Sequence, residues 1–290
     1  MYAWKYWRDT RARFLTFSVL WLGIALLLVF TTLSTHTRSE HWWRPAVPGG
    51  GYYPVWTQVI FGMALCGAMM AALAGFFLGA SGAGEEFERG TLPFLATRPR
   101  PRAYFVWTGW VVGAGELFVL LAAGMGVAFT VLIHFTVAGT RQLTLARARP
   151  LPHQLFYLFD WAWLVRLFVW RIVVLLLLLW ITGLVCYSLA YLLTLIARSR
   201  PNGAAFAIGL SIAYLVAAYL LRHYAGINVP TPVNLFDWMS DGRTRSLYIA
   251  GHYVVVHISI PYPFSALAGW LVVSVAFVLA HRLLFDRADV

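Results

Sequence analysis

Long apolar stretches alternate with shorter polar segments along this chain of 290 residues. A helix rises 1.5 Å per residue, so about 20 apolar residues cross the roughly 30 Å of hydrocarbon in a bilayer. Stretches of that length predict transmembrane helices near residues 14–33, 59–80, 104–137, 171–197, 203–221 and 264–285. The third is longer than a bilayer requires, which predicts a helix that tilts or extends beyond the membrane. We therefore predict an all-α, polytopic integral membrane protein with about six transmembrane helices and a single permease-sized domain over residues 1–290.

The basic residues predict how these helices are oriented, because cytoplasmic loops retain Lys and Arg during insertion. Arginines in the segments that would face outward are spread over longer loops, so the bias is one of density. We expect both termini to be cytoplasmic. In that arrangement the inner segments carry Lys5, Arg8, Arg11, Arg13, Arg89, Arg98, Arg100, Arg102, Arg198, Arg200, Arg282 and Arg287.

Three segments outside the apolar runs have their own compositions. Residues 1–13 mix aromatic and basic side chains, which predicts an interfacial helix on the cytoplasmic leaflet. Residues 151–170 are crowded with Trp and Phe, which favours a second interfacial helix, with a partly inserted segment as the alternative. For residues 222–263 we expect an external cap with re-entrant helices. Metal binding by Asp237, Asp241 and nearby histidines is the weaker interpretation.

Composition and charge exclude several functions. Hydrophobic residues make up 61% of the chain and charged residues 11%, whereas about a quarter of a soluble domain is charged. The net charge of +11 is scattered over many loops, which favours anionic lipid headgroups over nucleic acid as partner. Cys66 and Cys186 both fall in predicted spans, which argues against a disulfide or metal site. Because a P-loop needs a lysine after its glycines and Lys5 is the only lysine, we expect neither ATPase activity nor catalytic residues in this chain.

The loop at residues 81–103 is the most specific local pattern. Glu85, Glu86 and Glu88 place carboxylates just beyond the end of the second apolar run. Thr91 is a suitable N-cap for a short helix, and Pro99 ends that helix. A short helix with an apolar side has too little area to be stable alone, so we expect it to dock against another protein.

This loop resembles the first cytoplasmic loop of the permease subunits of type-2 ATP-binding cassette (ABC) transporters. In that family, acidic residues precede Gly-Thr-Leu, a pair of apolar residues, a proline and an arginine. Pro93 departs from the pattern, since the family commonly has a helix-compatible polar residue there. The matching residues are Glu86, Glu88, Gly90, Thr91, Leu92, Phe94, Leu95, Pro99 and Arg102.

The resemblance implies a permease in the cytoplasmic membrane of a bacterium. Its partners would be ABC ATP-binding subunits, which bind ATP and Mg²⁺, and a second permease in a homodimer or heterodimer. Export is the family's usual direction, and the aromatic content is compatible with an amphipathic, lipid-like or glycan substrate. The residues that would form the coupling helix and contact the ATPase are Glu85, Glu86, Glu88, Arg89, Gly90, Thr91, Leu92, Phe94, Leu95, Pro99 and Arg102.

A second interpretation starts from the same glutamates. Glu85 and Glu86, followed by Arg89, resemble the EExxxR signature of intramembrane prenyl-protein proteases, with one residue fewer before the arginine. That family also needs histidines on later membrane helices, in an FxxxH context that this chain lacks. The later histidines considered are His134, His252 and His257.

Glu116 is the one acidic residue deep in a predicted span. An ionised carboxylate in hydrocarbon costs several kcal/mol, so this side chain must face protein, find a donor or be protonated. One hypothesis is an ion-coupled secondary transporter that uses Glu116, and the other is a buried structural carboxyl. The flanking Gly113 and Gly115 favour close helix packing.

Overall fold

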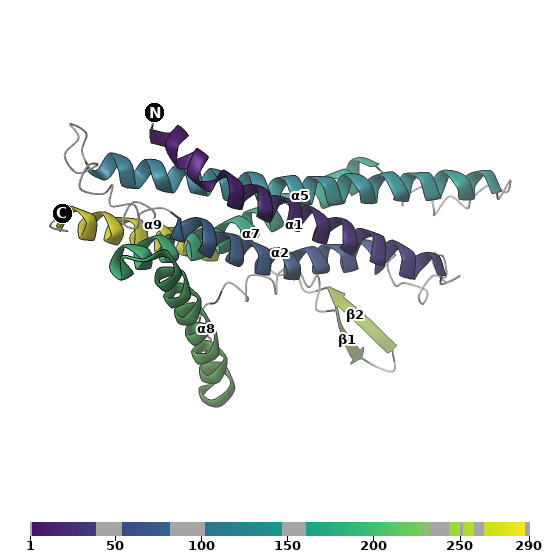
Figure 1. Ribbon diagram of the computed structural model, residues 1–290. Coiled ribbons are helices and arrows are strands. Elements are labelled where there is room, and N and C mark those ends of the chain that lie inside the picture. Colours follow the sequence, from purple (N-terminus) through teal and green to yellow (C-terminus); the bar gives the residue numbers. More distant parts are fainter. Residues whose placement is uncertain are drawn as a thin grey trace.

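The computed structural model describes residues 2–38, 54–81, 102–146, 161–227, 229, 231, 244–249, 252–257 and 264–287. Within these residues the helices are α1 (Tyr2–Arg38), α2 (Pro54–Ala80), α5 (Arg102–Ala146), α7 (Trp161–Ala197), α8 (Arg200–Ala225) and α9 (Phe264–Arg287). A two-stranded sheet contains β1 (Thr244–Ile249) and β2 (His252–His257). Figure 1 shows α1, α2, α5, α7 and α9 running along a common axis, whereas α8 diverges from them.

All six helices are long and apolar enough to cross a membrane, which confirms the prediction of a multi-pass membrane protein. The helices extend beyond the predicted apolar runs, and α5 reaches from Arg102 to Ala146. The candidate spans are Trp4–Thr32, Gly62–Ala80, Ala103–Val131, Ile172–Ala197, Arg200–Ala225 and Phe264–Arg287.

The interfacial helix expected at residues 1–13 is not a separate element. Helix α1 continues without interruption from Tyr2 to Arg38. This range has no proline and its first glycine is Gly23, so nothing in the sequence ends the helix between the basic start and the apolar run. Tyr6 and Thr10 are buried against other helices. The beginning of α1 is therefore part of the helical bundle.

The aromatic tract at residues 151–170 also differs from the expectation. From Trp161 onward it forms the first turns of α7, with no break before Ala197. A separate interfacial helix is therefore wrong for residues 161–170, which contain no proline or glycine to end one. Residues 151–160 lie outside the described part of the chain.

The expected re-entrant helices in residues 222–263 are replaced, where this segment is described beyond α8, by a β-hairpin. Strands β1 and β2 are antiparallel, with Thr244 opposite His257 and Ile249 opposite His252. Strand β2 has the sequence His-Tyr-Val-Val-Val-His, rich in β-branched and aromatic residues that favour strands. The two-residue connection includes Gly251, which is typical of tight hairpins. The fold is thus a helical bundle with a small hairpin rather than purely α-helical.

Small residues allow α2 and α7 to pack closely. A Cβ atom added at Gly75 would meet the carbonyl oxygen of Gly183, and one added at Gly79 would meet the carbonyl of Tyr187. A Cβ at Gly183 would lie 2.8 Å from the carbonyl oxygen of Ala71. Spacing of small residues by four places them on one face of a helix, where they allow the backbones to approach. This seam holds α7 in the middle of the bundle.

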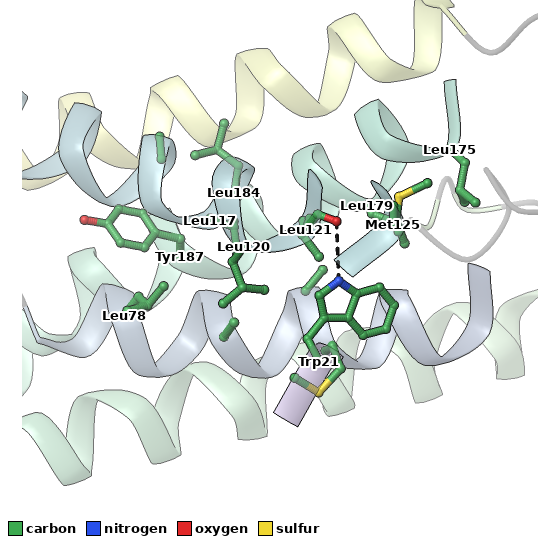
Figure 2. Close-up of a cluster of buried hydrophobic side chains, with 14 of the residues drawn as sticks. Trp21, Leu78, Leu117, Leu120, Leu121, Met125, Leu175, Leu179, Leu184 and Tyr187 are labelled. Carbon is green, nitrogen blue, oxygen red and sulfur yellow. Dashed lines mark hydrogen bonds between the residues drawn. The ribbon is translucent and has the colours of Figure 1, made fainter. Parts of the chain in front are cut away.

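Large apolar side chains fill the space between α1, α2, α5 and α7. Trp21 of α1 is fully buried, and its indole nitrogen donates a hydrogen bond to the Leu121 carbonyl of α5 at 3.4 Å. Figure 2 shows this bond within a cluster that includes Leu117, Leu120 and Leu179. The indole N–H thus finds an acceptor, as a buried tryptophan requires.

Helix α8 follows α7 after a tight turn. Arg198 has a φ of 51°, in the left-handed region, which ends α7. Ser199 is the N-cap of α8, and its carbonyl accepts a bond from the Gly203 amide at 3.0 Å. The first turn of α8 packs on Thr194 of α7, where only the glycine at 203 fits. Beyond this contact most of α8 is exposed in the isolated chain.

Candidate functional site

Most of the residues predicted to couple to an ATPase lie outside the described part of the chain. They are Glu85, Glu86, Glu88, Arg89, Gly90, Thr91, Leu92, Phe94, Leu95 and Pro99. Arg102 is the first residue of α5. The assignment of this loop therefore stays a prediction, but the helices on either side of it are described.

The two ends of this loop are held close to one buried side chain, Tyr187 of α7. The loop leaves α2 just after Gly79, which lies against the Tyr187 carbonyl. It returns into α5 shortly before Gly109, whose carbonyl accepts a hydrogen bond from the Tyr187 hydroxyl at 3.1 Å. Tyr6 of α1 bonds to the same hydroxyl at 2.7 Å. The loop therefore emerges at the end of the bundle where α1 begins, and Figure 1 shows the chain's C-terminal end there as well.

The tyrosines form a polar layer across three helices. Because the Tyr187 hydroxyl has one hydrogen and donates it to Gly109, Tyr6 must be the donor in the bond between the two phenols. Tyr191, one turn further along α7, donates to the carbonyl of Val106 at 3.4 Å. The Tyr187 hydroxyl lies where a side chain at position 113 would begin, so Gly113 makes room for the ring. The layer thus joins α1, α5 and α7.

Glu116 lies one turn beyond Gly113 on the same side of α5 and is only 6% exposed. Its Oε1 atom is 2.5 Å from the Thr10 hydroxyl oxygen of α1. Its Oε2 atom is buried, and no described residue offers it a hydrogen bond. The structure therefore agrees with the expectation that this carboxyl faces protein. The partner, Thr10, is 106 residues away in the sequence and was not anticipated.

A second polar group joins α5, α7 and α9, and the sequence analysis missed it. The hydroxyl oxygens of Ser188 and Ser274 are 2.7 Å apart, and the Trp110 indole donates to Ser188 at 2.9 Å. His281 of α9 stacks on Tyr191 with ring centroids 4.0 Å apart and bonds to the Tyr191 carbonyl at 3.0 Å. Serine and histidine inside apolar runs were the available signal, because polar residues within spans usually bond across helices.

The alternative functions gain no support from the described geometry. No cluster of three or more metal-ligand side chains occurs among the described residues. His134 lies 18 residues beyond Glu116 on α5, about 27 Å along the helix, while His252 and His257 are at opposite ends of β2. Glu85 and Glu86, which the protease hypothesis requires, are outside the described residues. Glu116 has no acidic side chain hydrogen-bonded to it in the described part of the chain.

Comparison with protein-family models, with curated proteins and with solved structures finds no match for this chain. The likeness to ABC permeases consequently rests on the residues of the 82–101 loop and on the arrangement of the helices around it.

Proposed function

We propose that this chain is the membrane-spanning permease subunit of an ABC transporter. The observation that carries the proposal is the position of the loop that bears the family pattern. It connects the second and third of six membrane-length helices, and its flanking helices meet at Tyr187 beside the start of α1. With the arginine distribution placing that end in the cytoplasm, the loop would be accessible to a cytoplasmic ATPase.

The packing around the loop suggests how force would be transmitted. Helices α2 and α5, which flank the loop, both contact α7 closely through glycine positions. Because small-residue contacts leave little room for sliding, a push on the loop would move α2, α5 and α7 together. Alternating access would follow when two permeases rock against each other. ATP and Mg²⁺ would be bound by the partner subunits, and their hydrolysis would supply the free energy.

The lipid-facing surface and the bundle interior fit an apolar or amphipathic cargo better than a highly charged one. Among the described residues, Glu116 is the only buried carboxylate. Buried tyrosine, tryptophan and serine side chains supply the other polar atoms of the interior. We propose an exporter of an amphipathic, lipid-like or glycan molecule, since such a substrate needs ring faces and few charges.

Isolation of the chain from native membranes tests the proposal. We expect an ATP-binding subunit with a P-loop to co-purify, and the complex but not the chain alone to hydrolyse ATP. The substitution Glu88→Lys should weaken association about tenfold or more, since it places a like charge where the carboxylate would meet a partner.

The matched control is Asp286→Lys, which reverses a carboxylate that is half exposed at the end of α9, outside the loop. Normal association of the Glu88→Lys variant, or ATP hydrolysis by the chain alone, would contradict the proposed function.

A further inference from the structure

The contact between α1 and α5 encloses a carboxyl group whose bonding is incomplete. Glu116 is 6% exposed, one oxygen contacts Thr10, and Oε2 has no hydrogen-bond partner among the described residues. An ionised carboxylate spreads its charge over both oxygens, so an unpartnered Oε2 would carry buried charge without compensation. A neutral carboxyl avoids that cost.

The hydrogen-bond inventory of Thr10 leads to the same conclusion independently. A threonine hydroxyl donates only one hydrogen bond. The Thr10 oxygen is 3.1 Å from the Tyr6 carbonyl and 2.5 Å from Oε1 of Glu116. If Glu116 is ionised, both neighbours are acceptors and only one can receive the hydrogen. If Glu116 carries a proton on Oε1, it donates to Thr10, Thr10 donates to Tyr6, and both contacts are hydrogen bonds.

The ionisable groups that neighbouring helices bring to this region carry no positive charge next to the carboxyl. Helix α1 contributes the Tyr6 phenol, and α7 contributes Tyr187 and Tyr191. From α9 comes His281, which bonds to the Tyr191 carbonyl rather than to Glu116. The only ionisable side chain of α2 is a cysteine.

Arginine does not compensate the carboxyl either. The side chain before Thr10, Asp9, pairs with Arg8 at 3.9 Å, and Arg8 is 55% exposed. The other salt bridge of the described residues joins Arg282 and Asp286 of α9 at 3.7 Å. Glu116 thus has a hydroxyl beside it and no cation bonded to it in the described part of the chain.

We propose that Glu116 is a proton-binding site that controls the packing of the beginning of α1 on α5. With the proton bound, Glu116 and Thr10 close the contact. When the proton passes to water, the carboxylate requires donors that the closed contact lacks, and the segment around Thr10 separates from α5 so that water reaches both carboxylate oxygens. The cycle involves one proton and no redox change.

This inference does not depend on the proposed transport function, because it concerns the conformation of the chain alone. It has a consequence for that function, however. The opened segment lies at the end of the bundle where the 82–101 loop is attached, so proton binding would alter the support of the first turns of α5.

Hydrogen exchange of the whole chain in zwitterionic lipid nanodiscs tests the proposal. The amides of residues 4–13 are compared in the wild type and in Glu116→Gln at each pH between about 5 and 9, so that the intrinsic chemistry of exchange cancels. The glutamine is neutral and its amide can donate to Thr10, so this variant should stay closed. We expect the ratio of wild-type to variant exchange to rise about tenfold per pH unit over the range where opening releases the proton.

Asp9→Asn is the control, because it removes a neighbouring carboxylate that already pairs with Arg8. Its response to pH should equal that of the wild type. A wild-type to Glu116→Gln ratio that is constant across the pH range would overturn the proposal, as would loss of the response in Asp9→Asn.

A second measurement uses only the wild-type chain and does not require the variant to fold. An apolar carbodiimide reacts with protonated carboxyl groups in apolar surroundings. We expect mass spectrometry to find the adduct on Glu116 near pH 6, with labelling reduced about tenfold or more near pH 9. Labelling of other carboxylates with Glu116 unmodified at the lower pH would overturn the proposal.

Discussion

Helices α7 and α8 follow each other in the sequence and are both strongly apolar, yet they occupy different surroundings. In the most apolar stretch of α7, 61% of the residues are buried within the chain, compared with 17% in α8. Helix α7 contacts α2, α5, α8 and α9, whereas α8 has extensive contact only with α7 and α2. Equal suitability for a membrane therefore does not imply an equal place in the bundle.

The difference arises from small and polar side chains. Helix α7 has Gly183 at its contact with α2 and Ser188 at its contact with α9. In α8 the buried residues are the small ones at 203, 204, 207 and 218. Large apolar residues such as Phe206 and Tyr219 are more than 60% exposed. Because lipid accommodates apolar side chains as readily as a protein interior does, close packing and hydrogen bonds decide which helices associate.

The largest difference is expected from a bulky side chain at a glycine. In Gly183→Leu the first added atom would lie 2.7 Å from Leu117 Cδ2 and 2.8 Å from the Ala71 carbonyl, so α2 and α7 must separate. We expect a loss of at least about 3 kcal/mol in the free energy of unfolding, or failure to fold. Unfolding by titration with SDS, followed by tryptophan fluorescence, measures this loss.

Gly209→Leu on α8 is the matched control, since no described atom lies within 4 Å of a Cβ at that position. Its effect should stay within about 0.5 kcal/mol. Equal losses for the two variants would mean that the α2–α7 seam is not specially close.

A smaller effect is expected when a buried leucine is shortened. Leu178 of α7 is fully buried against Leu267 of α9, and Leu178→Ala leaves a cavity. Since lipid solvates apolar chains, the loss comes mainly from the cavity and should be about 2 kcal/mol in the same titration. Leu210→Ala on α8, which is 53% exposed, should change stability by less than about 0.5 kcal/mol. A similar loss at position 210 would show that α8 has a partner surface in the membrane.

The smallest effect is expected from a hydrogen bond between helices. Ser188→Ala removes the contacts with Ser274 and Trp110. Such bonds contribute about 0.6 kcal/mol on average in a membrane, so we expect a loss of about 0.6–1 kcal/mol. Ser211→Ala, on the partly exposed α8, serves as the control and should be neutral. A loss at 188 no greater than that at 211 would remove hydrogen bonding from the explanation of why α7 is central.

The success of the sequence analysis depended on whether a feature was local. The lengths of the apolar runs predicted all six membrane-length helices, because each run must satisfy its own backbone bonds in lipid. The hairpin was missed although Tyr253 to Val256 and Gly251 were a local signal for it. The partner of Glu116 had no such signal, since Thr10 is brought to it by the packing of α1 on α5. The coupling pattern around Glu88 remains a prediction.

Amino-acid composition alone thus established that most of this chain lies in lipid and which stretches cross it, because hydrocarbon tolerates few charges and no unpaired backbone groups. It could not establish that Tyr6, Gly109 and Tyr187 meet, or that a carboxyl at position 116 shares a hydroxyl with α1. Those contacts join residues far apart in the chain, and they exist only where the helices have packed.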